Sequence, residues 1–339
     1  MGINRAIVWQ VASPRLISCV LALAALTAGA CSSPAPPLTG GEPKVSGVAG
    51  GKGGVAANGG VSATATATPS PSALTPEAYK GELDSRHKSL VDAINALAAA
   101  RGVKALDQRV SRAEQALSGA ADALGALSPP DAIRPQHDAY VTSLRDFATE
   151  LGSTSGKVGA RNLCTSSAVL TDLDDKLTAL DKAGEALQSA GDYPADIVNV
   201  SAKNKQTRRL SNGSFIRKSS LNGRSSLEID NGGSRDAVVT VVKGGSKAFT
   251  IYVRKKAKFK VRGVRDGSYK IYFTHGVDWD GKSKSFTREC SFERFQKTVK
   301  FKTTFTATQI RWHDWRITLH AISGGNARTA PVDPDDFPG

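Results

Sequence analysis

Apolar residues follow a helical period in the first half of the chain. Between Leu83 and Leu187 they recur every three or four positions, the spacing of an α-helix with one buried face. Thr75-Pro76 predicts a helix start, because threonine caps the N-terminus and proline fits the first turn. Ser128-Pro129-Pro130-Asp131 predicts a break between helices. Four amphipathic segments with short joints favour an antiparallel four-helix bundle over residues 75–190.

The period changes to two after residue 211. Short runs rich in β-branched and aromatic residues alternate with turn signals such as Asn212-Gly213, Gly244-Gly245 and Asp266-Gly267. The runs predicted to be strands are residues 237–242, 248–253, 257–261, 269–273, 299–305 and 310–319. This spacing predicts an antiparallel β-sandwich over residues 212–325. Segment 261–269 resembles a hairpin of small immunoglobulin-like accessory domains. We therefore expect an α + β multidomain protein, in which the four-helix bundle is followed by an immunoglobulin-like β-sandwich.

Two further segments flank the predicted β-sandwich. Residues 191–211 are predicted to be a basic linker, which carries Lys203, Lys205, Arg208 and Arg209. Residues 326–339 are predicted to be an acidic tail with three aspartates.

The first 30 residues predict an export signal. Arg5 and Arg15 supply a positively charged start, residues 17–26 form a short apolar core, and small residues precede Cys31. The apolar core is too short for a membrane span, which needs about 20 residues. Ala28-Gly29-Ala30-Cys31 resembles the lipobox of bacterial lipoproteins, although that pattern prefers leucine where Ala28 stands.

This resemblance implies cleavage before Cys31 and attachment of a diacyl lipid to its sulfur. Two or more acyl chains anchor a protein firmly, whereas one chain binds only marginally. Ordinary secretion with cleavage near this point is the alternative.

Residues 31–74 predict a disordered tether. They contain nine glycines and six prolines, a composition that buries too little apolar surface to offset the entropy lost on ordering. A flexible coil of this length spans roughly 35–40 Å. We expect it to hold the folded units clear of the lipid head-groups.

Positive charge is concentrated in the C-terminal part of the chain. The 339 residues include 45 Lys and Arg against 31 Asp and Glu, a formal net charge of +14. Residues 201–339 alone carry 28 basic and 12 acidic side chains. For an exported protein, this distribution indicates an anionic partner outside the membrane rather than nucleic acid.

A row of cations is the main candidate binding site. Over residues 256–262 cationic and apolar positions alternate, so the apolar ones can face a core while the cations share the other face. The alternative is a solvated lysine-rich face that protects an edge strand from aggregation. The residues predicted to bind a polyanion are Lys256, Lys258, Lys260, Arg262, Lys300 and Lys302.

Two cysteines remain after the predicted export and lipidation. An oxidising exterior favours a disulfide between Cys164 and Cys290, which would join the bundle to the sandwich. Two separate buried cysteines are the alternative, because no spacing brings these residues together.

No motif for catalysis or metal binding stands out. The sequence lacks a nucleophile elbow, a His-Glu-x-x-His motif, a P-loop and a dinucleotide fingerprint. We expect no catalytic residue, no cofactor and no metal. His87 and His137 lie on apolar stripes, where they are expected to pack at the edge of the core. Asp278-Trp279-Asp280-Gly281 superficially resembles a calcium loop, but its glycine stands at the wrong position for an EF-hand.

Three structural motifs carry a wider resemblance over residues 128–339. They are Leu127-Ser128-Pro129-Pro130, Asp230-Asn231-Gly232-Gly233 and Gly324-Gly325-Asn326-Ala327. With them the chain resembles lipoproteins of actinobacterial cell envelopes. The resemblance implies a location on the extracytoplasmic face of the cell membrane and implies no activity.

These observations together predict a lipid-anchored, non-catalytic binding module. We expect its basic β unit to dock on an anionic lipid or a cell-wall polymer. The alternative is an accessory subunit that binds a solute or a protein in the cleft between bundle and sandwich.

Overall fold

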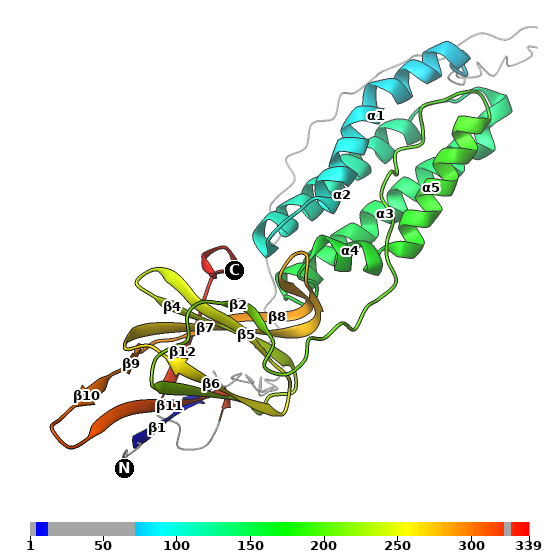
Figure 1. The fold of residues 1–339 in the computed structure, drawn as a ribbon. Helices are drawn as coiled ribbons and strands as arrows, with labels where there is room; N and C mark the ends of the chain where they lie inside the picture. Colours follow the sequence, from blue (N-terminus) through cyan, green and yellow to red (C-terminus); the bar gives the residue numbers. More distant parts are fainter. Residues whose placement is uncertain (1–4, 13–71, 322–326, 339) are drawn as a thin grey trace, which may run out of the picture. The chain divides into compact units, whose positions relative to one another are not determined.

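The computed structural model describes residues 5–12, 72–321 and 327–338. Within this part of the chain the fold is α + β: the α-helices lie before residue 190, and the strands lie after residue 214 except for one at Arg5–Ala12 (Figure 1). Cys31, residues 13–30 of the predicted signal and residues 31–71 of the predicted tether lie outside the described residues.

The helical region comprises five α-helices and one 3-10 turn. Thr75 caps the first helix as predicted, because its hydroxyl accepts a hydrogen bond from the Ala78 N–H at 3.2 Å. The predicted fourth segment is two helices, since the backbone leaves the helical conformation at Leu173 (φ −100°). The elements are α1 (Pro76–Ala98), α2 (Val103–Gly125), η1 (Asp131–Ile133), α3 (Arg134–Gly159), α4 (Ser166–Asp172) and α5 (Asp174–Ser189).

The apolar stripes of these helices form one core. Leu90, Ile94, Val110 and Leu144 are all buried in it. No helix among the described residues is both long and apolar enough to cross a membrane.

Part of the predicted linker belongs to the helical core. Tyr193, Ala195 and Ile197 are buried against the helices, and the rings of Tyr193 and Tyr79 pack edge to face with their centres 5.2 Å apart. Gly184 makes this packing possible, because a Cβ there would lie 2.5 Å from the Ala195 carbonyl oxygen. Only the later part of residues 191–211 crosses to the strands.

The strands form a continuous hydrogen-bonded set in the order β2-β5-β4-β7-β8-β12-β1-β11-β3-β6, with β9 on β7 and β10 on β11. Most pairs are antiparallel, but β11 pairs with β3 in parallel, and β1 pairs in parallel with β11 and β12. The strands are β1 (Arg5–Ala12), β2 (Phe215–Lys218), β3 (Ser225–Asn231), β4 (Asp236–Lys243), β5 (Ser246–Val253), β6 (Ala257–Val264), β7 (Gly267–Asp280), β8 (Ser285–Phe295), β9 (Val299–Phe301), β10 (Thr303–Phe305), β11 (Ile310–Ala321) and β12 (Ala327–Pro331).

Two strands lie in segments for which the sequence predicted other roles. β12 occupies residues assigned to the acidic tail, and its Ala327 is fully buried. The 3-10 turn η2 (Pro334–Asp336) follows it. β1 falls within the predicted export signal.

Backbone contacts and a disulfide connect the helical region to the strands. The Cys164 N–H donates to the Thr287 carbonyl at 2.8 Å, and the Cys290 N–H donates to the Arg161 carbonyl at 3.1 Å. Cys164 and Cys290 form a disulfide across this junction, with their Cα atoms 6.3 Å apart. The segment after α3 is thereby fixed to the middle of β8.

Candidate functional site

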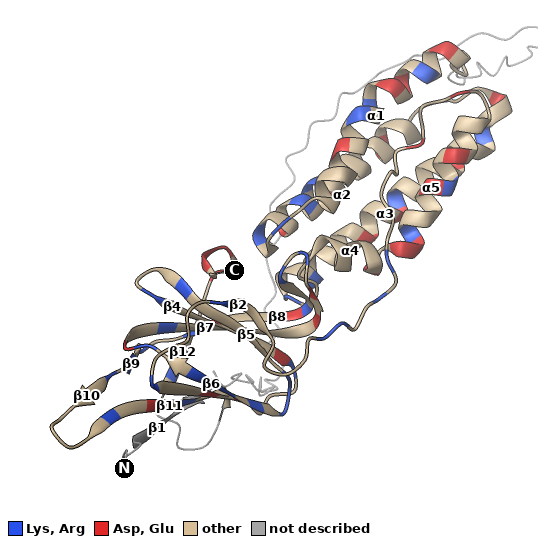
Figure 2. Cartoon of the chain, in the orientation of Figure 1, with Lys and Arg blue, Asp and Glu red and all other residues tan. Residues whose placement is uncertain are grey.

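The cations of β6 lie on an edge strand. β6 ends the strand order and, within the described part of the chain, pairs only with β3. Lys258, Lys260 and Arg262 are exposed, while Val261 is buried and Phe259 is half-buried, so the predicted alternation of faces holds. The strand therefore presents three neighbouring cations on its outer face. Figure 2 shows Lys and Arg at several places along the strands.

Acidic residues on β3 partly neutralise this face. Asp230 forms ion pairs with Lys258 at 3.0 Å and with Arg316 of β11 at 3.1 Å. Glu228 lies opposite Lys260 in the strand register and pairs with Arg316 at 3.4 Å. The sequence did not predict these carboxylates beside the cations, because it did not predict a strand over residues 225–231.

The other predicted cations are distributed differently. Lys256 lies in the turn before β6 and donates to the Gly232 carbonyl at 2.7 Å. Lys300 is on β9, which pairs with β7 rather than β6, and Lys302 follows it. Both are exposed. Strand pairing thus divides the six residues into a β6 group and a β9 group. Within the described residues, Lys260, Arg262, Lys300 and Lys302 have no side-chain hydrogen bond or ion pair.

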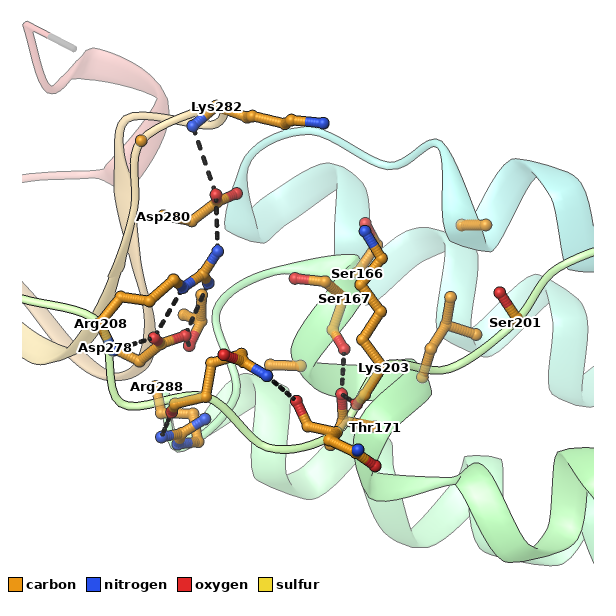
Figure 3. A pocket seen from close by; sticks show the side chains of 17 residues that line it. Ser166, Ser167, Thr171, Ser201, Lys203, Arg208, Asp278, Asp280, Lys282 and Arg288 are labelled. Atoms are coloured by element: carbon orange, nitrogen blue, oxygen red, sulfur yellow. Dashed lines mark hydrogen bonds and ion pairs between the residues drawn. The ribbon is translucent and has the colours of Figure 1, made fainter.

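A polar cavity lies where the helical region meets the strands. It has a volume of about 570 Å³ and is lined by α4, the later part of the linker and the β7–β8 hairpin. Figure 3 shows Arg208, Asp278, Asp280 and Lys282 on one side of it.

Arg208 and Asp278 make the fixed wall of this cavity. The Arg208 guanidinium donates to both carboxylate oxygens of Asp278, at 2.9 and 2.8 Å, and to Asp280 at 3.1 Å. The backbone N–H of Arg208 also donates to Asp278, at 2.8 Å, as does the Thr287 hydroxyl, at 2.7 Å. The residues that superficially resembled a calcium loop hold a guanidinium instead.

These bonds decide the ionisation of Asp278. Burial opposes its negative charge, but the hydrogen bonds from Arg208 and Thr287 outweigh burial and lower its pKa to about 2. Asp278 also has a left-handed backbone (φ 59°), a conformation that residues other than glycine adopt at an energetic cost. The network holds it there.

The opposite side of the cavity carries hydroxyls and a lysine. Ser166 and Ser167 of α4 lie there with Lys203, and Thr171 donates to the Lys203 carbonyl at 2.7 Å (Figure 3). The amines of Lys203 and Lys282 have no hydrogen bond or ion pair with any residue that the structure describes. Four cations and two carboxylates line the cavity, so its net charge is positive.

The histidines are held by single hydrogen bonds in the helical region. His87 Nε2 bonds to the Asp196 carbonyl at 3.0 Å. His137 Nδ1 lies 2.7 Å from the Tyr79 hydroxyl, and burial lowers the pKa of His137. Across the described ranges, no group of three or more His, Cys, Asp or Glu could hold a metal ion.

Comparison of the chain with protein-family models, with curated proteins and with solved structures found no match.

Proposed function

We propose that this protein is a lipid-anchored binding protein of the extracytoplasmic membrane face, whose basic β region docks on an anionic envelope component. Cys31 would carry the anchor and residues 31–74 would space the folded part from the membrane. The observation that carries the docking proposal is the pair Lys260 and Arg262, exposed on an edge strand without any ion pair among the described residues.

Docking by charge fits this surface better than a solvated protective face alone. Lys256 and Lys258 have partners within the fold, whereas Lys260 and Arg262 are exposed and pair with no described residue. Each cation near an anionic bilayer contributes about 1 kcal/mol, and the attraction fades over a Debye length of about 8 Å. Lys300 and Lys302 supply a second contact of the same sign.

The test is co-sedimentation of the full chain with phosphatidylglycerol vesicles and with purified cell wall. Cys31→Ser removes the proposed anchor from every sample, so that only docking is measured. Lys260→Glu/Arg262→Glu is expected to lower affinity about tenfold or more. Lys104→Glu/Lys182→Glu makes the same charge change at exposed positions of α2 and α5 and should have little effect. Equal binding by all three forms would rule out the β6 cations as the docking site.

The anchor is tested separately by mass spectrometry of the N-terminus. The proposal requires the first residue of the membrane-bound protein to be Cys31 with a diacylglyceryl group on its sulfur. An unmodified N-terminus beginning at another residue contradicts the anchor while leaving the docking proposal intact.

The junction cavity supports a second candidate function, the binding of a small polar solute. Its specific support is that Lys203 and Lys282, whose amines have no partner among the described residues, line the cavity from opposite sides, and that the Arg208–Asp278 pair fixes the wall on the Lys282 side. Hydroxyls and unpaired ammonium groups suit a hydroxylated carboxylic acid. Glucuronate is the probe: Lys203→Gln/Lys282→Gln should abolish its saturable binding, and Lys260→Glu/Arg262→Glu should not.

We also propose the finer description of the fold, a helical bundle joined to an immunoglobulin-like sandwich. In support, α1, α2, α3 and α5 share one apolar core. The strands β4, β5 and β7 share another core with β3, β6 and β11. Experimental coordinates of the chain would test this assignment directly.

A further inference from the structure

A second cavity lies at the β4–β5 hairpin, and the charged residues that line it are all cations. Gly244 and Gly245 adopt left-handed conformations (φ 55° and 80°), which gives a tight two-residue turn. The register places Lys243 opposite Ser246 and Val242 opposite Lys247. The turn thus brings two lysines and a hydroxyl to one end of the strands, beside a cavity of about 300 Å³.

Lys243 is held in place at this cavity. Its Nζ donates to the Asp266 carbonyl at 2.6 Å and lies 5.6 Å from the centre of the Tyr269 ring. The side chain crosses the backbone of Gly267, where a Cβ would lie only 2.5 Å from the lysine Cε. Glycine at this position therefore leaves room for the lysine side chain. One N–H of the Lys243 ammonium group donates to Asp266, and the other two stay available.

Among the described residues, no carboxylate lines this cavity. Its lining includes Lys243, Lys247 and Arg265 and contains no Asp or Glu. The neighbouring carboxylate of Asp266 accepts from the N–H and hydroxyl of Thr303, at 2.7 and 2.9 Å. Burial lowers the pKa of Lys247, and the nearby positive charge of Arg217 lowers it further.

We propose that this cavity is a phosphate-binding site, in which Lys243, Lys247 and Arg265 hold a phosphate group with help from the Ser220 and Ser246 hydroxyls. Three cationic donors and two hydroxyls line the cavity, and a tetrahedral phosphate offers acceptor oxygens to all of them. A carboxylate has only two oxygens in one plane. The cavity is at the small end of ligand sites, so it accommodates one phosphate group and its immediate substituent.

This site is separate from the β6 cations and does not depend on their role. The phosphate could be the free ion or an ester such as a lipid head-group or a polymer unit. The chemistry of recognition is the same for both sources, and the experiment distinguishes them.

The experiment is isothermal titration calorimetry of the full chain carrying Cys31→Ser, at constant ionic strength. The probes are inorganic phosphate, glycerol phosphate and acetate. Saturable binding of either phosphate, with acetate at least tenfold weaker, is expected. Tighter binding of glycerol phosphate identifies an esterified source, and tighter binding of inorganic phosphate identifies the free ion. Failure of both phosphates to bind overturns the proposal.

Three variants locate the binding. Lys247→Gln/Arg265→Gln should weaken phosphate binding at least tenfold, whereas Lys104→Gln/Lys182→Gln, the same change at exposed positions of α2 and α5, should leave it within twofold. Ser246→Glu places a carboxylate at the exposed turn without touching the core and should abolish binding. If Lys247→Gln/Arg265→Gln is fully folded and binds phosphate as tightly as the chain with the unmodified cavity, the proposal is overturned.

Discussion

At the scale of single residues, Asp278 shows how ion pairing and burial combine in this protein. It is almost completely buried, it has a left-handed backbone, and it accepts hydrogen bonds from Arg208 and Thr287. An unpaired carboxylate would be costly in such a place, because burial penalises its charge. The Arg208 side chain is the group that makes this position compatible with an ionised aspartate.

Because the pKa of folded Asp278 is about 2 and its ordinary value is 3.8, the stability that its ionisation contributes is fully present above about pH 4. It is lost as the pH falls from about 4 toward 2, when the folded protein also takes up the proton. Arg208 is partly exposed to water, so we expect the loss to be about 1–2 kcal/mol. Chemical denaturation between pH 2 and pH 5 measures it.

Asp278→Asn should remove this part of the pH dependence and lower the free energy of unfolding at pH 7 by about 1–3 kcal/mol. Asp84→Asn is the matched control, since Asp84 is exposed and has no hydrogen bond or ion pair with the described residues. An unchanged acid profile in Asp278→Asn would contradict the assignment of the low pKa to this residue.

At the scale of elements, β6 is shaped by a bulge. Ser225 of β3 lies opposite Val264 and Ser226 lies opposite Arg262, so Gly263 is the extra residue between them. Its backbone is left-handed (φ 79°), and a Cβ there would lie 2.2 Å from the Leu221 carbonyl oxygen. A bulge of this kind bends the strand and increases its twist, which sets the direction in which Arg262 leaves the sheet.

Gly263→Ala should therefore destabilise the protein by about 1–3 kcal/mol, because both the backbone conformation and the contact with Leu221 oppose a side chain. Thermal and urea unfolding would measure the change. Gly281→Ala serves as control, since no atom lies within 4 Å of its position for a Cβ and its φ is not left-handed. Equal stability of the two variants would show that the bulge tolerates alanine.

The sequence predicted the elements whose apolar period is strong and missed those that depend on partners. The helices α1, α2 and α3 were predicted because one face of each is buried, and the strands β4, β5 and β7 because β-branched and aromatic residues are concentrated in them. The division between α4 and α5 was not, since the period continues through Leu173. β3 was not predicted although nearly all of its residues are buried. Its apolar run is short and ends at Asp230 and Asn231, so the strand depends on its pairing with β6 and β11.

The candidate sites show the same limit. Alternation in the sequence was sufficient to predict the exposed cations of β6, but the opposing Glu228 and Asp230 became visible only through strand register. The junction cavity combines residues from α4, the linker and β7–β8, and no local pattern relates these segments.

At the scale of the whole molecule, the disulfide is the one covalent link between the helical region and the strands beyond the chain itself, within the described residues. It closes a loop with a sequence separation of 126 residues, and cross-links over long loops restrict the unfolded chain strongly. It also lies next to residues that line the junction cavity, Thr287 and Arg288.

Cys164→Ser/Cys290→Ser is expected to lower the free energy of unfolding by about 2–5 kcal/mol. Denaturation followed by circular dichroism measures this, and peptide mapping without reductant should recover the two cysteines in one linked pair of peptides. Recovery of both as unlinked thiol peptides from the native protein would contradict the bridge. Glucuronate binding by this variant would show in addition whether the junction cavity needs the cross-link.

The position of β1 has a consequence for the order of events during synthesis. β1 pairs with residues 313–321 and 327–328, so it can enter the sheet only after nearly the whole chain has left the ribosome. An export signal is read while the chain is still emerging, and a contact this distant in sequence forms late. If residues 1–30 act as proposed, translocation therefore competes with folding for the same eight residues. Once they are removed, β11 and β12 lose their shared parallel neighbour.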